Sequence, residues 1–152
     1  MKSIRRYMIY FACFSLSAFL AVECCFGAHG WEGCPDLQKF IEQTDPEHNT
    51  WKDLYRLFKT YKGCDDGVYA EGFSDFVARS LAKHWDRLDE LAALSLNDKT
   101  FREFVLRHID ATADTSDLSL LLSNAQKRCP ATTTQLCSDI IKAALSALEF
   151  NK

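Results

Sequence analysis

Apolar side chains recur along most of this chain at intervals of three and four residues, which is the period of an amphipathic helix. The clearest run places four large side chains on one face: Trp51, Leu54, Tyr55 and Phe58. Thr50, with Asp53 three residues later, resembles a capping box, and Gly63 favours a stop. The spacing therefore predicts a helix from residue 51 to about residue 62.

The same period predicts six more helices, at about 35–43, 66–83, 84–96, 98–109, 117–128 and 133–150. Pro35 suits the first turn of the opening helix, Asp65 or Asp66 can cap the helix at 66, and Ser116 is the expected cap of the helix at 117. Gly72 is small enough to mark a close helix crossing. No segment alternates with period two for long enough to predict a strand. The expected fold class is all-α, either a compact bundle or a short solenoid of helical pairs, with about six to seven helices.

Residues 1–27 follow a different pattern, which is typical of a secretory signal peptide. Basic residues come first, and an uncharged, largely apolar stretch occupies 7–22. Cys25 and Gly27 place small side chains at positions −3 and −1 of a cleavage site before Ala28. We expect the segment to be removed on export to the periplasm, which leaves residues 28–152 as a single helical domain.

Two other interpretations of this segment stay open. A retained membrane anchor is disfavoured, because residues 7–22 are short for a span that needs about 20 apolar residues. Acylation of Cys24 or Cys25, as in a lipoprotein, is disfavoured because Glu23 occupies a position that normally holds a small residue. The chain is therefore expected to be free of the membrane once the signal is removed.

Four cysteines stay in the mature chain, and an even number in an exported domain predicts two disulfides. Three pairings are possible among Cys34, Cys64, Cys129 and Cys137. The spacing C-P-A-T-T-T-Q-L-C favours a local clasp between Cys129 and Cys137 at a turn between two helices, which leaves Cys34 to pair with Cys64. A metal site is not expected, because neither C-x-x-C nor H-E-x-x-H occurs.

The charge of the mature chain argues against a nucleic-acid partner. Loss of Lys2, Arg5, Arg6 and Glu23 from 18 basic and 21 acidic side chains leaves 15 and 20, a formal charge of −5. The remaining chain has no run rich in Lys and Arg, which phosphate binding requires.

Candidates for nucleophilic or metal-assisted catalysis are few. No G-x-S-x-G motif occurs, and the four cysteines are expected to be oxidised. Asp65 and Asp66 resemble the start of a calcium loop, but Phe76 stands where such a loop needs its glutamate. We expect no cofactor, no metal and no enzymatic activity.

Two histidines are each followed by an aspartate two residues later, which suggests a His-Asp relay: His84 with Asp86, and His108 with Asp110. Residues i and i+2 of a helix point in different directions, so neither histidine meets its neighbour through regular geometry. A helix-end or partly buried structural role is the preferred interpretation, and an exported enzyme using His84 or His108 is the least favoured alternative.

Three segments carry a resemblance to a known family: Y-K-G-C-D-D-G at 61–67, W-D-R-L-D-E-L at 85–91 and D-K-T-F-R-E-F-V-L-R-H at 98–108. Together with the signal, they are similar to the small exported all-helical immunity proteins that Gram-negative bacteria make against peptidoglycan amidases delivered by type VI secretion. The resemblance implies a periplasmic inhibitor, commonly a homodimer, that blocks the cleft of a peptidoglycan hydrolase toxin with a protruding loop. The alternative is a non-enzymatic structural domain of the cell envelope.

Two polar segments are candidate partner-binding surfaces, because loops held by rigid helices often carry recognition. The first contains Asp65, Asp66 and Glu71. The second is the predicted loop 110–117, with Asp110, Asp114, Thr115 and Ser116. We prefer the second, because Asp65 and Asp66 have a competing role in capping. The loop is longer than a helix junction requires, and its four named side chains have no evident packing role. An ordinary solvated connection is the alternative for this loop.

Overall fold

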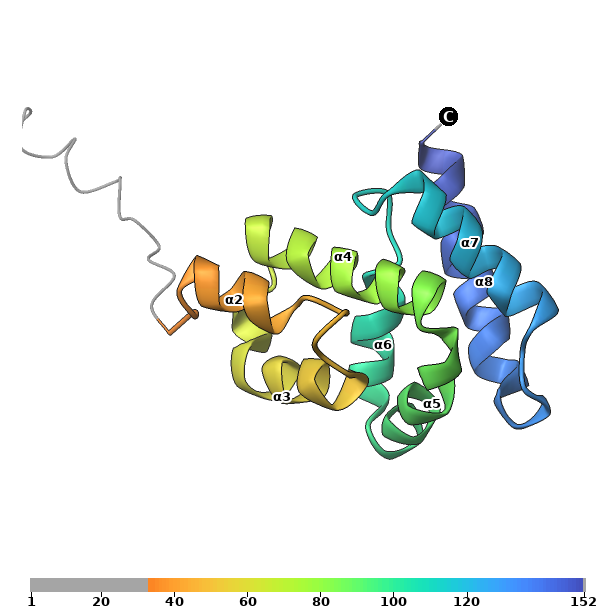
Figure 1. The fold of residues 1–152 in the computed structure, drawn as a ribbon, viewed down its shortest axis with the longest axis horizontal. Coiled ribbons are helices and arrows are strands. Elements are labelled where there is room, and N and C mark those ends of the chain that lie inside the picture. The colour runs from red at the N-terminus through yellow and green to blue at the C-terminus, as the bar shows by residue number, and fades with distance from the viewer. Residues whose placement is uncertain (1–32, 152) are drawn as a thin grey trace, which may run out of the picture. The chain divides into compact units, whose positions relative to one another are not determined.

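The computed structural model of the protein describes residues 33–151, which form an all-α unit (Figure 1). The predicted signal segment, its cleavage site, Cys24 and Cys25 lie outside the described residues. Seven α-helices are described: α2 Leu37–Gln43, α3 Trp51–Tyr61, α4 Gly67–Lys83, α5 Leu88–Asn97, α6 Lys99–Arg107, α7 Thr115–Lys127 and α8 Thr134–Phe150. Short 3₁₀ turns precede α4, α5 and α8 at Lys62–Cys64, Trp85–Arg87 and Ala131–Thr133. The described part contains no strand, so the predicted fold class is confirmed.

Helices that are distant in the sequence share one core, which makes this unit a compact bundle. The long helix α4 extends between α2 and α7 and packs against both (Figure 1). Helix α7 packs in turn on α8, which also contacts α6, while α3 packs on α5 and α5 on α6. In a solenoid each repeat contacts only its neighbours, so these contacts favour the bundle.

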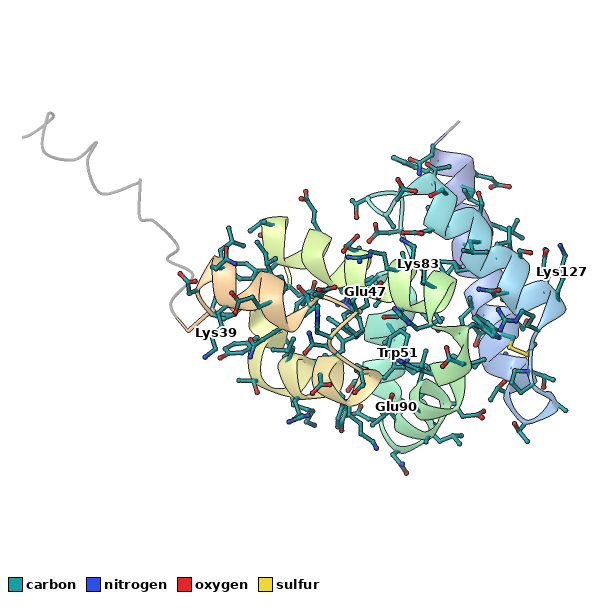
Figure 2. All side chains as sticks on the ribbon, in the orientation of Figure 1. Lys39, Glu47, Trp51, Lys83, Glu90 and Lys127 are labelled. Carbon is teal, nitrogen blue, oxygen red and sulfur yellow. A yellow bond between two sulfur atoms is a disulfide. The ribbon has the colours of Figure 1, made fainter. Side chains whose placement is uncertain are left out.

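Aromatic side chains from four helices fill the centre of this core. Phe40, Phe73 and Phe104 are almost fully buried, and their rings meet edge to face at centroid distances of 5.0 and 5.1 Å. Trp51 points inward from the start of α3 (Figure 2) and contacts Phe76 at 5.6 Å. Such pairs contribute about 1 kcal/mol beyond the burial of their surface.

The crossing of α2 and α4 depends on Gly72. A Cβ atom at this position would lie 2.5 Å from a ring carbon of Phe40, closer than real contacts allow. Phe40 is itself 1% exposed and has no room to move away. The expectation that Gly72 marks a close helix crossing is therefore confirmed.

The predicted helices are confirmed, with shifts at some ends. Helix α2 begins at Leu37 rather than at Pro35, because the Asp36 carboxylate accepts hydrogen bonds from the N–H groups of Gln38 and Lys39. Pro35 therefore precedes the cap and lies outside the first turn. The helix expected at 84–96 opens with a 3₁₀ turn at Trp85–Arg87 before α5 begins.

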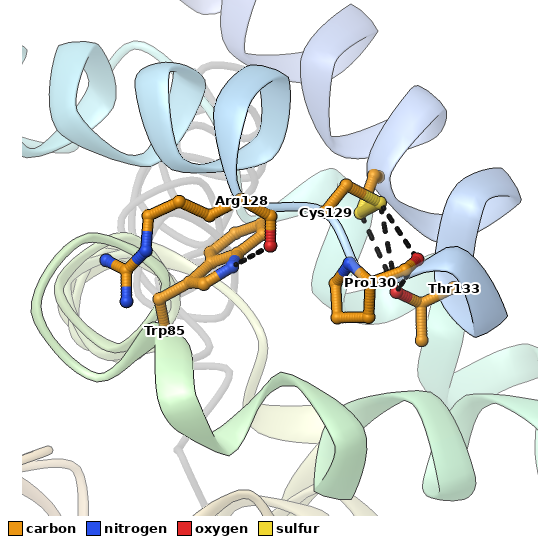
Figure 3. The surroundings of a disulfide bond; sticks show 6 residues. Trp85, Arg128, Cys129, Pro130 and Thr133 are labelled. Carbon is orange, nitrogen blue, oxygen red and sulfur yellow. Dashed lines mark hydrogen bonds between the residues drawn. A yellow bond between two sulfur atoms is a disulfide. The ribbon is translucent and has the colours of Figure 1, made fainter.

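Both preferred disulfides are present. Cys34 pairs with Cys64, at a Cα–Cα distance of 5.7 Å, and Cys129 pairs with Cys137 at 6.1 Å. The second bond closes the turn between α7 and α8, beside the hydrogen bond from Trp85 Nε1 to the carbonyl oxygen of Arg128 (Figure 3). Two structural disulfides indicate a non-reducing compartment. None of helices α2 to α8 has the length and apolar character needed to span a bilayer.

Candidate functional site

The preferred binding segment, predicted as a loop at 110–117, is shorter in the structure, because α7 begins at Thr115. Asp114 is its N-cap, and the Asp114 carboxylate accepts from the N–H groups of Ser116 and Asp117 at 2.7 and 3.3 Å. The assignment of Ser116 as the cap is therefore wrong. The hydroxyl and N–H of Ser116, with the N–H of Asp117, hold the pKa of Asp114 below its usual range. Asp114, Thr115 and Ser116 are exposed, but they belong to a helix start rather than to a projecting loop.

Asp110 also has a structural role that the sequence did not reveal. Its Oδ1 accepts from the Thr112 N–H at 2.8 Å and the Thr112 hydroxyl at 2.6 Å, and its Oδ2 accepts from the Ser74 hydroxyl on α4 at 2.8 Å. Burial raises the pKa of Asp110, but these hydrogen bonds outweigh it, so the pKa lies below its ordinary value. The expectation that Asp110 lacks a packing role is wrong, and its carboxylate is ionised at neutral pH.

A groove lies between the Asp110 segment and the end of α8. Its volume is about 490 Å³, and most of its lining is apolar. The lining side chains come from α6, the following turn and the last two turns of α8: Leu106, Ile109, Asp110, Ala111, Thr112, Ala143, Ser146, Ala147 and Phe150. Phe150 is 85% exposed, an unusual position for a large aromatic side chain. The groove therefore combines one fixed negative charge with an apolar wall and an exposed aromatic ring.

Only part of the preferred binding segment 110–117 lies at the groove. Asp110 lines the groove, whereas Asp114, Thr115 and Ser116 are not among its lining residues. The sequence pattern did not predict the α8 side of the groove, where Ala143, Ala147 and Phe150 provide the apolar side chains. Their spacing of four and three residues is a helical signal for a second apolar stripe beside the core stripe of that helix.

In the other predicted segment, Asp65 and Asp66 are already engaged in contacts within the chain. Asp66 caps α4 by accepting from the N–H of Gly67 at 2.8 Å, so one of the two predicted caps is confirmed. Asp65 accepts from His108 Nε2 at 2.9 Å and pairs with Arg107. Glu71 is exposed on α4. Asp65 is thus tied to the end of α6 and is not free to bind a partner.

His108 is a buried structural residue rather than a member of a relay with Asp110. Its side chain is 3% exposed, and Nδ1 lies 2.8 Å from the carbonyl oxygen of Phe104 while Nε2 faces Asp65. Both ring nitrogens thus face oxygen atoms within hydrogen-bonding distance. The ring joins the C-terminal end of α6 to the turn before α4.

His84 and Ser74 are likewise held in structural interactions. His84 caps the end of α4, and its Nε2 lies 3.4 Å from Glu47 Oε1 rather than near Asp86. Ser74 is 1% exposed and donates its hydroxyl to Asp110. A nucleophile must reach its substrate, and a side chain that is 1% exposed has no such access. Within residues 33–151, no group of three or more His, Cys, Asp or Glu side chains is placed to hold a metal ion.

Lys83 and Asp117 connect α4 to α7 beside the Asp114 cap. Lys83 extends from the last turn of α4 (Figure 2), and its Nζ lies 3.2 Å from Oδ1 of the largely buried Asp117. This ion pair links the end of α4 to the first turn of α7.

Comparison with known proteins finds no family model, no curated relative and no solved structure that matches this chain. The likeness to immunity proteins stays a hypothesis.

Proposed function

We propose that the mature chain is a periplasmic inhibitor of the immunity type, which binds and blocks a secreted peptidoglycan hydrolase. The signal-like segment 1–27 and the two disulfides support a function outside the cytoplasm. The similarity at 61–67, 85–91 and 98–108 supports the choice of a cell-wall amidase as partner. The proposed activity is binding alone, without catalysis.

The observation that carries the proposal is the groove beside Asp110 and Phe150. Phenylalanine is one of the aromatic side chains enriched at protein interfaces, and Phe150 is solvent-exposed beside an apolar hollow. The Asp110 carboxylate has about four acceptor sites and uses three within the chain, so one remains for a donor of the partner. The complementary surface would present an apolar side chain beside a lysine or arginine.

Rigidity of the Asp110 segment strengthens this assignment. The hydrogen bond from Ser74 and the two from Thr112 hold the turn in one conformation before any partner arrives. A preformed surface loses less entropy on binding than a mobile loop does. The negative charge of the mature chain would also accelerate encounter with a basic active-site cleft.

The catalytic alternative is disfavoured by the occupation of its candidate residues. His108 is buried against Asp65 and the Phe104 carbonyl, and His84 ends α4 near Glu47. A general base must reach a proton of the substrate, and a ring that is 3% exposed has no such access.

Capture from the native host tests the proposal. The tagged protein, exported with its own signal, is crosslinked and purified beside two variants, Phe150→Ala and Leu120→Ala. Leu120 is 45% exposed on α7 and does not line the groove, which makes it the matched control. We expect a peptidoglycan hydrolase to be enriched by the wild type and by Leu120→Ala, but not by Phe150→Ala.

Two results would contradict the proposal. If Phe150→Ala captures a hydrolase as strongly as the wild type does, the groove is not part of the interface. A stable homodimer that captures no hydrolase and dissociates in Phe150→Ala would assign the groove to a second copy of the chain, as sedimentation velocity would show.

A further inference from the structure

A second hollow lies between the end of α2, the turn after it and one face of α3 (Figure 1). Its volume is about 260 Å³. The lining side chains are Gln43, Asn49, Asp53, Arg56, Leu57, Thr60 and Tyr61. Among these seven, only Leu57 has no polar atom, whereas most of the groove at Asp110 is apolar. The two sites share no residue, so they are separate.

Helix α3 supplies five of the lining side chains from one face, at positions i, i+3, i+4, i+7 and i+8 counted from Asp53. Asp53 is held in place by the capping box, because its Oδ2 accepts from the Thr50 N–H at 2.9 Å and from the Thr50 hydroxyl at 2.8 Å. The Oδ1 atom of the same carboxylate pairs with the guanidinium of Arg56. The wall formed by α3 is therefore fixed before any ligand arrives.

Three polar atoms of this hollow are unpaired and open to solvent. Both N–H groups of the Asn49 amide donate to backbone carbonyls, of Glu42 at 2.8 Å and Asp45 at 2.9 Å, which leaves the Asn49 side-chain oxygen as an acceptor. The other two are the Tyr61 hydroxyl and the Gln43 amide nitrogen. None of the three is among the buried side-chain atoms that lack a partner within residues 33–151, so a ligand can reach each of them. The Gln43 amide oxygen is buried, which makes the nitrogen the end that a ligand meets.

The charges of the hollow cancel, because Asp53 and Arg56 pair with each other and the other lining side chains are neutral. The Arg56 side chain is 75% exposed, and its guanidinium has further N–H donors besides the one used by Asp53. The hollow thus offers donors and acceptors side by side without a net charge. Hydroxyl groups both donate and accept, so a neutral ligand with several neighbouring hydroxyls matches this set better than a carboxylate or an ammonium group does.

We propose that this hollow, termed the Asn49 pocket, binds one unit of a neutral sugar. Arg56 and the Gln43 amide donate to hydroxyl oxygens of the sugar, and the Asn49 side-chain oxygen accepts from a hydroxyl. Tyr61 adds a polar hydroxyl and an apolar ring, which suits a ligand that has hydroxyls and C–H faces. The volume is below the 300–1,000 Å³ or so of pockets for drug-sized ligands, so a single ring is the expected occupant. The ring belongs either to a free sugar or to a glycan chain.

Titration of the exported, ¹⁵N-labelled protein followed by NMR tests this inference. The neutral probes are N-acetylglucosamine and its β-1,4-linked trimer, and the charged probes are glucosamine, a cation at about pH 6, and glucuronate, an anion. We expect saturable shifts at Asn49, Arg56 and Tyr61 with N-acetylglucosamine, and dissociation constants about threefold or more higher for both charged sugars. Tighter binding of the trimer identifies a glycan as the source, and equal affinity identifies a free sugar.

Two variants separate binding from structure. Tyr61→Phe removes only a hydroxyl, which makes no bond within the described chain, and should weaken N-acetylglucosamine about threefold or more without lowering the melting temperature. Arg56→Gln leaves the charge of Asp53 uncompensated, so the preference for N-acetylglucosamine over glucosamine should fall about threefold or more. Arg102→Gln is the matched control, because Arg102 pairs with Asp139 and does not line the pocket, and it should leave that preference unchanged.

Several results would overturn the proposal: absence of saturable shifts with both neutral probes, tighter binding of either charged sugar by the wild type, or unchanged affinity in Tyr61→Phe. An equal preference in Arg56→Gln and Arg102→Gln would do the same. Tighter binding of the dipeptide N-acetyl-Ala-Ala-amide would assign the pocket to a peptide instead. These outcomes do not depend on Phe150 or on the hydrolase partner.

Discussion

His108 and Asp65 are 43 residues apart in the sequence, yet the Nε2 atom of His108 lies 2.9 Å from Oδ1 of Asp65. This contact joins the end of α6 to the turn before α4, directly after the disulfide residue Cys64. Arg107 pairs with the second oxygen of the same carboxylate. Asp65 thus ties the end of α6 to the turn before α4, two segments that the sequence leaves unconnected.

We predict that Asp65→Asn destabilises the protein by about 2 kcal/mol, since the loss of a charged acceptor leaves the buried ring of His108 poorly paired. Asp66→Asn is the matched control. An asparagine caps helices as well as an aspartate does, so that change should cost about 0.5 kcal/mol or less. Urea unfolding of both variants gives the comparison, and equal midpoints would show that the Asp65 contact adds nothing to stability.

A second prediction concerns acid stability. Hydrogen bonds from the Thr100 hydroxyl and the Phe101 N–H, then from the Tyr55 hydroxyl, with the charge of Lys59, lower the pKa of Asp98 from 3.8 to about 2. A lowered pKa means that the unfolded chain binds the proton more readily. The ionised Asp98 carboxylate therefore stabilises the folded protein fully above pH 3.8, and this stabilisation is lost as the pH falls towards 2.

Asp98→Asn keeps a capping side chain but removes the ionisable group. The difference in unfolding free energy between wild type and Asp98→Asn should therefore shrink as the pH falls from about 4 to about 2. Chemical unfolding at several pH values across this range measures it. A difference that stays constant would show that the charge of Asp98 is not the source of its contribution.

A third prediction tests the corrected start of α7. Because Asp114, not Ser116, accepts the free N–H groups, Asp114→Ala should lower the melting temperature by several degrees, and Ser116→Ala by clearly less. Thermal unfolding followed by circular dichroism compares the two. The reverse order would restore Ser116 as the cap.

The disulfides give a fourth prediction. Cys34–Cys64 closes a loop with a sequence separation of 30, against 8 for Cys129–Cys137. A longer closed loop restricts the unfolded chain more, so replacing the first pair by serine should cost about 1 kcal/mol more than replacing the second. Calorimetric melts of the two double variants decide the order. A larger loss for Cys129→Ser/Cys137→Ser would mean that contacts in the native clasp outweigh loop entropy.

Local patterns predict the helices well, because each depends on residues within a turn or two. Thr50 and Asp53 form the expected reciprocal contacts, with the Thr50 N–H 2.9 Å from an Asp53 oxygen. The Cys129–Cys137 clasp is equally local. At the start of α7, two suitable caps stand two residues apart, and the pattern alone does not decide between Asp114 and Ser116.

The candidate site is only half predictable from the sequence, because its two sides come from distant segments. Asp110 stands out as a polar residue in a turn, but its bond to Ser74 spans 36 residues. The groove pairs Leu106 with Phe150, and periodicity does not show which helix faces meet.

The most direct test of the proposed function is the affinity between the exported protein and the hydrolase that it captures, measured by isothermal titration calorimetry for the wild type, Phe150→Ala and Leu120→Ala. Phe150→Ala should raise the dissociation constant about tenfold or more, because an anchor at the groove is lost, while its melting temperature stays close to that of the wild type. Leu120→Ala should leave the dissociation constant within about twofold. A dissociation constant unchanged by Phe150→Ala would contradict binding through this groove.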